Sequence, residues 1–141
     1  MRKKVQAVCK NYGVKFIVHT FWRAGLALGA DGAHLPLPVC AAMTAAVASA
    51  GRAFGRPYTS AEEAKAAIKF GAAYLTAGHI YASSCKQGVP PRGPAFLREI
   101  CTLSPVPVYA IGGIGLNKEQ LDEVLACGAA GACVRSAFMR L

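Results

Sequence analysis

The sequence predicts an α/β fold in which short parallel strands alternate with helices. The chain of 141 residues is 54% hydrophobic and only 16% charged, whereas a disordered chain has the opposite balance. Its apolar segments are short and do not alternate with polar residues, which is typical of strands buried on both faces. A glycine–alanine phrase precedes several of them, as where a helix ends at glycine and leads into a strand. One domain over residues 1–141 is expected, because this length matches the usual domain size.

The predicted elements alternate from the first residues onward, beginning with a helix. Six helices are predicted, at residues 3–11, 22–28, 39–49, 60–70, 93–103 and 117–126. Six strands are predicted, at residues 14–18, 31–35, 52–54, 73–77, 106–111 and 131–134, and the one at 52–54 has the weakest pattern.

Local signals at the element ends support these boundaries. Ser60 stands before Ala-Glu-Glu and Asn117 before Lys-Glu-Gln, so each places a capping side chain and an acidic first turn at a helix start. Gln at the third position after Asn117 completes a capping-box pattern. Ser104-Pro105-Val106-Pro107 ends one helix and leads into the next strand, because the residue before a proline disfavours the helical conformation.

Repeated βα units form either an open, doubly wound sheet or a closed (β/α)8 barrel. Six strands are too few to close an eight-stranded barrel, which usually needs roughly 200 residues or more. Strand number alone therefore favours the open sheet.

The charge balance favours an anionic partner. Sixteen Lys and Arg against seven Asp and Glu leave a net charge of +9. Residues 1–60 hold eight basic residues and one acidic residue, a balance of +7, whereas residues 61–141 hold eight and six, a balance of +2. A phosphorylated small molecule or a nucleic acid would suit this excess. The alternative is an ordinary solvated surface.

The cysteines and the apolar runs indicate a cytoplasmic protein. None of the six cysteines forms a C-x-x-C pair, which disfavours a zinc or redox motif. Cysteines scattered among Ala and Val are more often small buried residues in a reducing compartment. The uncharged run at 32–51 contains two prolines, and alanine is its commonest residue, so it is a poor membrane span.

Two loops at predicted strand ends suit a phosphate group. Gly112 and Gly113 follow the strand at 106–111, and Ser136 follows the strand at 131–134 at an expected helix start. Glycine backbone and a helix N-terminus both present N–H groups to an anion, and in barrels the loops after the last two strands commonly hold phosphate. The alternative is a pair of tight turns.

The long loop after the strand at 73–77 is the best candidate for chemistry. His79 follows the strand directly, and Lys86 and Arg92 lie further along the loop. A histidine titrates near neutrality and can move a proton, and Lys86 could neutralise a carboxylate or phosphate. The alternative is a hydrogen-bonded structural histidine beside a solvated lysine. Cys85 is a possible nucleophile for which spacing assigns no base.

His19 and His34 also end predicted strands. Both could face the site, and a structural role suits each of them better than a catalytic one.

Several loop motifs together resemble the thiamine-phosphate synthase/TenI family over essentially the whole chain. They are Gly78-His79-Ile80-Tyr81, Cys85-Lys86-Gln87-Gly88, Arg92-Gly93, Ala110-Ile111-Gly112-Gly113-Ile114 and Val134-Arg135-Ser136-Ala137. The resemblance implies a partial (β/α)8 TIM barrel holding the third to eighth strands, with the first two strands and the last helix missing. An incomplete barrel exposes strand edges that invite pairing with another chain, so a homo-oligomer is expected.

The family has two enzymatic branches, and the resemblance favours the TenI-like thiazole tautomerase. The synthase branch joins a pyrimidine pyrophosphate to a thiazole phosphate with magnesium, whereas tautomerases move a proton on a thiazole carboxylate phosphate without metal. Where the synthase has Asn-Asp this chain has His19-Thr20, and a second synthase Asp falls on Val39. Magnesium needs oxygen ligands, so no metal or other cofactor is expected unless the chain is a synthase.

The resemblance also implies roles for individual residues. His79 would be the general acid/base, and Lys86 would lie near the substrate carboxylate. The remaining assignments are Ser83, Cys85 and Arg92 at the substrate and Gly112, Gly113, Ile114, Val134 and Ser136 at its phosphate. Arg135 stands where the family usually has an apolar residue, so we expect it to point away into the helical layer.

The expected partner is a phosphorylated thiazole, and three alternatives to the tautomerase stay open. The first is thiamine-phosphate synthase, and the second is a catalytically inactive ligand-binding or regulatory protein of the same family. The third is a nucleic-acid binder, which the dispersed basic residues and the lack of an aromatic–basic platform disfavour.

Overall fold

Six parallel strands form one sheet in the computed structural model, which describes residues 2–19, 21–35, 53–58 and 60–140. The strands are β1 (Ile17–His19), β2 (Gly32–His34), β3 (Ala53–Tyr58), β4 (Tyr74–Gly78), β5 (Val108–Ile111) and β6 (Gly131–Cys133). The helices are α1 (Arg2–Asn11), α2 (Trp22–Ala27), α4 (Ala61–Lys69), α5 (Gly93–Leu103) and α6 (Lys118–Ala126). The helix predicted at 39–49 lies outside the described residues.

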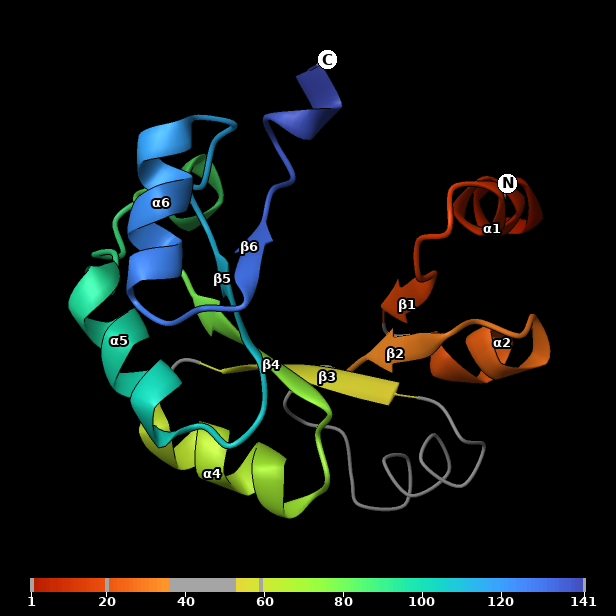
Figure 1. The fold of residues 1–141 in the computed structure, drawn as a ribbon, viewed down its shortest axis with the longest axis horizontal. Helices are drawn as coiled ribbons and strands as arrows, with labels where there is room; N and C mark the ends of the chain where they lie inside the picture. The colour runs from red at the N-terminus through yellow and green to blue at the C-terminus, as the bar shows by residue number, and fades with distance from the viewer. Residues whose placement is uncertain (1, 20, 36–52, 59, 141) are drawn as a thin grey trace.

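The order of the strands decides between the two architectures. Each strand pairs in parallel with the next one along the chain, in the order β1-β2-β3-β4-β5-β6. A doubly wound sheet reverses its strand order at a switch point, whereas an unbroken order with crossovers of one hand keeps the helices on one side. Figure 1 shows the sheet curled, with α4, α5 and α6 against its outer side. The open sheet favoured by strand number is therefore wrong, and the partial barrel is confirmed.

Most predicted strands match the observed ones to within a few residues, but β3 is longer than predicted. The pattern gave a strand only at 52–54, because Gly55 and Pro57 are residues that usually interrupt strands. The observed strand continues to Tyr58. Gly55 is tolerated because the ring of Tyr74, on the neighbouring strand β4, occupies the space where a side chain on Gly55 would lie.

The core lies between the sheet and its outer helices. Side chains along a strand point alternately to its two faces, so Leu75 and Ala77 of β4 pack outward, both fully buried. Leu97 and Ile100 of α5 and Val124 of α6 cover them and belong to the same buried cluster. The other residues of β4 therefore face the inner, concave side of the curled sheet.

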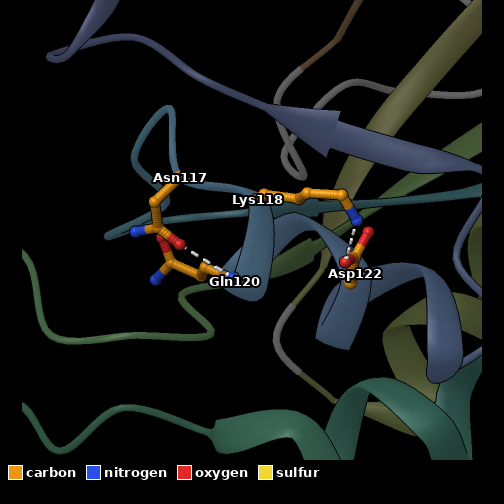
Figure 2. Close-up of polar contacts among 4 residues, drawn as sticks. All are labelled: Asn117, Lys118, Gln120 and Asp122. Atoms are coloured by element: carbon orange, nitrogen blue, oxygen red, sulfur yellow. Dashed lines mark hydrogen bonds and ion pairs between the residues drawn. The ribbon is translucent and has the colours of Figure 1, made fainter.

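The start of α6 shows how a helix is placed beside the inner loops. The side-chain oxygen of Asn117 accepts a hydrogen bond from the backbone N–H of Gln120 at 2.8 Å, so the predicted cap is confirmed (Figure 2). Lys118 and Asp122 form an exposed ion pair at 2.6 Å one turn apart, and such pairs contribute little to stability. The amide of Gln120 does not complete the expected capping box; it reaches into the loop after β5 instead.

No helix among the described residues is both long and apolar enough to span a bilayer.

Candidate functional site

A cavity of about 650 Å³ opens at the carboxyl ends of β4, β5 and β6, within the usual range for small-molecule sites. Nine of the ten residues predicted for the site line it. They are His79, Ser83, Cys85, Lys86, Arg92, Gly112, Gly113, Ile114 and Ser136. The fold thus brings together the loops after three consecutive strands, and the chemical roles of these residues stay predictions.

The loop after β4 is joined directly to the turn Gly112–Gly115 after β5, called the glycine turn below. The backbone N–H of Ile80 donates to Ile111 O at 3.0 Å, and that of Tyr81 donates to Gly112 O at 3.0 Å. The Tyr81 hydroxyl also donates to the Glu123 carboxylate of α6 at 2.5 Å. The candidate catalytic loop and the candidate phosphate loop therefore form one unit.

The two glycines serve this contact rather than clearing space for a ligand. Gly112 has φ 97° and Gly113 has φ 70°, a region that residues with a side chain rarely adopt. A Cβ on Gly112 would overlap the Cβ of His79, and one on Gly113 would lie 2.6 Å from Tyr81 O. The contact between the two loops therefore requires glycine at both positions.

The glycine turn nevertheless offers donors to an anion. Among the residues that the structure describes, the backbone N–H groups of Gly113 and Ile114 have no hydrogen-bond acceptor. The N–H of Gly115 donates to Gln120 Oε1 at 2.7 Å, and Gln120 Nε2 donates to Gly113 O at 3.1 Å. Gln120 thus holds the turn at both ends, and consecutive N–H groups in such a turn form an anion-binding concavity.

His79 is positioned by the far end of its own loop. Its Nε2 lies 3.2 Å from Val89 O, and because a carbonyl can only accept, this contact requires the proton on Nε2. The lone pair of the neutral ring is then on Nδ1, as a general base requires. The loop is closed by Arg92 N, which donates to His79 O at 2.9 Å, and by Gly93 N, which donates to Ile80 O at 3.0 Å.

The cavity is strongly cationic. Its described lining includes four basic side chains and no carboxylate; the four are Lys86, Arg92, Arg135 and Arg140. Lys86 belongs to a short 3-10 helix, Ser84–Lys86, whose preceding Ser83 hydroxyl accepts from Cys85 N at 3.4 Å. The Arg92 guanidinium lies 5.4 Å from the centre of the Phe96 ring. A phosphate or carboxylate would be attracted to this cavity.

Arg135 does not point into the helical layer, as the sequence led us to expect. Its Nη2 donates to Cys85 Sγ at 3.1 Å, across the cavity mouth. The reason is the two-residue period of an extended chain: Cys133 and Arg135 both line the cavity. Val134 between them packs against the hydrophobic core instead, so it is the one predicted phosphate residue that does not line the cavity.

Ser136 lies at the cavity, but not at the start of an α-helix. After β6 the described chain forms a single short 3-10 turn, Phe138–Arg140. Such a turn presents fewer aligned N–H groups than the expected helix.

The cavity also includes residues that sequence reasoning missed. Pro57, Thr76 and Cys133 lie deeper along their strands than the predicted loop residues, and Arg140 lies on the final 3-10 turn. Burial raises the pKa of the Cys133 thiol. Thr76 could have been identified from the alternation of side chains along a strand, because it stands two residues before Gly78 and so on the same face of β4.

His19 and His34 lie outside the cavity lining, in a row of rings across the concave face. The rings of His19 and His34 are 5.4 Å apart, those of His34 and Tyr74 5.8 Å, and those of Tyr74 and Tyr109 5.8 Å. Burial, and secondarily the neighbouring His19, lowers the pKa of His34 from 6.5 to about 4. Burial, with smaller effects of Cys133 and Tyr109, raises the pKa of Tyr74 to about 12.

The described residues include no cluster that could hold a metal ion by protein ligands alone. Magnesium is held by carboxylate and other oxygen ligands, and no group of three or more His, Cys, Asp or Glu among the described residues is placed to hold a metal. Thr20 and Val39, the positions where the synthase has carboxylates, lie outside the described residues.

Comparison with known proteins relates the chain to enzymes of thiamine synthesis. A family model described as thiamine monophosphate synthase (TMP-TENI) matches residues 1–138. The thiamine-phosphate synthase of Salinispora arenicola is 35% identical over 142 residues, covering 98% of this chain and 66% of that protein. The thiamine-phosphate synthase of a Synechocystis species is 36% identical over 140 residues, covering 97% of this chain and 40% of that protein.

A solved structure gives the same relationship in three dimensions. The thiamine phosphate pyrophosphorylase from Pyrococcus furiosus superposes with a TM-score of 0.86 at 32% identity, covering 99% of this chain and 66% of that one. The chain therefore spans less than two thirds of the length of each of these relatives.

Proposed function

The chain belongs to the thiamine monophosphate synthase family, and on that basis we propose that it acts in thiamine biosynthesis as a synthase-type enzyme whose cavity holds a phosphorylated thiazole. The relatives reported above are named for thiamine-phosphate synthesis. One observation carries the proposal: the lining of the cationic cavity includes Ser136 and the N–H groups of Gly113 and Ile114, which have no acceptor within the described part of the chain. These donors suit the phosphate, and the rest of the cavity suits a small ring.

Calorimetry tests the binding half of this proposal. Thiazolylethyl phosphate should bind measurably, whereas the corresponding alcohol should bind far more weakly. The reason is that the N–H groups of Gly113 and Ile114 (the cradle) and the four basic side chains all act on the phosphate. Equal affinity for the two compounds would exclude a phosphate site here. Inorganic phosphate should compete with the ester for the same site.

A turnover assay tests the catalytic half. The protein is incubated with a pyrimidine pyrophosphate and a thiazole phosphate, with magnesium and then with a chelator, and thiamine phosphate is measured. Formation that depends on magnesium is expected of a synthase. Binding of the thiazole phosphate without any product would favour the inactive ligand-binding protein instead.

A second candidate function, the thiazole tautomerase, is favoured by the position of His79. Its ring lies at the cavity beside the glycine turn with Nδ1 as the lone-pair nitrogen, and the described lining holds no carboxylate for a metal. His79 would take a proton from one ring position of the substrate and return it at another, and Lys86 would hold the carboxylate. This reaction would need no metal and should persist in a chelator.

His79→Gln tests the tautomerase directly. Removing a general acid/base typically costs ~10²–10⁴-fold in rate, so kcat for tautomerisation should fall by that amount. The affinity for thiazolylethyl phosphate should remain, because the phosphate donors are on another loop. Gln87→Ala, in the same loop but outside the cavity lining, serves as the control. Unchanged tautomerisation in His79→Gln would exclude His79 as the catalytic group.

A further inference from the structure

Thr76 of β4 carries a buried hydroxyl without a partner. The residue is 3% exposed, and its Oγ1 is a buried side-chain polar atom with no hydrogen bond among the described residues. Buried polar groups in proteins are nearly always hydrogen-bonded, because an unpaired one loses its interactions with water without replacement. An unpaired hydroxyl in the middle of a sheet therefore needs an explanation.

The strands on either side do not supply the missing partner. Thr76 is in register with Pro57 on β3 and with Tyr109 on β5, and a proline has no N–H to donate. On the concave face, Thr76 lines the cavity together with Ile111 and Cys133, whose side chains are apolar or weakly polar. Thr76 faces no other opening among the described residues, so the cavity is the side from which a partner would approach this hydroxyl.

The hydroxyl also lies below the glycine turn, at a distance that the ring of a bound phosphate ester could span. Thr76 precedes Gly78 by two residues, which is about 7 Å along a strand, and Gly78 is level with Ile111, just before the glycine turn. A ligand whose phosphate occupies the turn would extend its other end along this wall toward Thr76. The wall is otherwise apolar, so one polar contact there would fix the orientation of a flat ring.

We propose that Thr76 is a specificity-determining residue, and that its hydroxyl donates a hydrogen bond to an acceptor atom, such as a ring nitrogen, of a heteroaromatic phosphate ester. The inference rests on the proposed function, because it takes the phosphate to be held at the glycine turn. It adds that the buried end of the substrate is recognised by one hydroxyl. A ring without an acceptor would leave this hydroxyl unpaired and bind more weakly.

The test compares two esters of similar shape on four proteins, the wild type and three variants. Thiazolylethyl phosphate has a ring nitrogen, whereas phenylethyl phosphate has none, and inorganic phosphate reports on the cradle alone. Thr76→Val removes the hydroxyl and keeps the branched shape, and Thr76→Ser keeps the hydroxyl. Thr102→Val, on the exposed face of α5, is the matched control for the same chemical change.

Thr76→Val should weaken the binding of thiazolylethyl phosphate about 3- to 10-fold, which is the usual contribution of one hydrogen bond. Inorganic phosphate and phenylethyl phosphate should bind as before, and Thr76→Ser should retain most of the wild-type affinity. The ligand-free Thr76→Val protein should melt at a higher temperature than wild type, because it no longer buries an unpaired hydroxyl. A purely structural threonine would instead lower the melting temperature and affect all three ligands alike.

Two results would overturn the inference while leaving the proposed function intact. One is a Thr76→Val protein that binds thiazolylethyl phosphate as tightly as wild type. The other is a wild type that binds thiazolylethyl and phenylethyl phosphate equally well. A wild type that binds inorganic phosphate but neither ester would instead overturn the proposed function, and with it the substrate that Thr76 is assigned to recognise.

Discussion

At the scale of single residues, Arg135 lines the cavity because side chains alternate in direction along an extended chain. It follows Cys133 by two residues, both line the cavity, and its guanidinium contacts Cys85. Sequence reasoning placed it in the helical layer because the family usually has an apolar residue there. The extended backbone at the end of β6 assigns that direction to Val134 instead.

Arg135→Met should therefore weaken binding of phosphate esters about 3- to 10-fold, because it removes one cationic donor from an exposed cavity mouth. The loss should shrink as salt is added, since exposed charges are screened. Calorimetry at low and high ionic strength measures both effects. Arg23→Met, on α2 outside the cavity lining, is the control. Unchanged affinity at low salt would show that Arg135 does not contribute to anion binding.

At the scale of elements, the start of α6 stabilises the loop after β5. Asn117 caps the helix, which leaves the amide of Gln120 free to bond both ends of the glycine turn. The helix thereby sets the direction of the unpaired N–H groups of Gly113 and Ile114. A single amide connects helix formation to the shape of the candidate phosphate site.

Gln120→Ala should lower both stability and phosphate affinity. Two hydrogen bonds, each worth about 0.5–1.5 kcal/mol, are lost, so the free energy of unfolding should fall by about 1–3 kcal/mol in urea titrations. Inorganic phosphate should bind more weakly because the turn is no longer held. Leu125→Ala, which replaces an exposed residue of the same helix by another strong helix former, should change neither quantity. A destabilised Gln120→Ala protein with full phosphate affinity would show that the turn keeps its shape without this clamp.

At the scale of the whole molecule, the curled sheet has an outer face covered by helices and an inner face crossed by the ring row. In the described part of the chain the sheet ends at β1 and β6, which stand on either side of its open face (Figure 1). Unpaired edges favour association with another strand, so self-association stays a prediction. Light scattering over a range of concentrations measures it, and a constant monomer mass would contradict it.

The inner face makes folding stability depend on pH through His34. Its pKa is about 4 in the folded protein and about 6.5 when unfolded, so between these values the unfolded chain binds a proton that the folded protein does not. The free energy of unfolding should be highest above about pH 6.5 and fall as the pH drops to about 4. Because the ring is partly exposed, solvent screening limits the loss to about 2 kcal/mol.

Urea titrations of wild type and His34→Gln at several pH values isolate this contribution, because carboxylate effects are common to both proteins. The difference between the two should grow as the pH falls below about 6.5. Parallel pH profiles would show that His34 does not couple folding to protonation.

The sequence by itself determined the elements and the loops that carry the candidate site. Helix caps, glycine helix ends and short apolar runs are local signals, since each depends on a few neighbouring residues. Ser60 and Asn117 therefore mark helix starts that the structure reproduces. Residues at the ends of parallel strands meet at one edge of a sheet, which is why nine of ten predicted site residues line one cavity.

Tertiary structure alone decided the length of β3 and the depth of the site, and the observed strand order separated the open sheet that strand number favours from the partial barrel that the family resemblance implies. Strand order depends on which strands pair with one another, and the number of strands does not specify that pairing. Gly55 fits inside β3 only because Tyr74 covers it from another strand. The unpaired hydroxyl of Thr76 and the inward direction of Arg135 likewise depend on contacts between elements far apart in the sequence, which no local pattern of residues specifies.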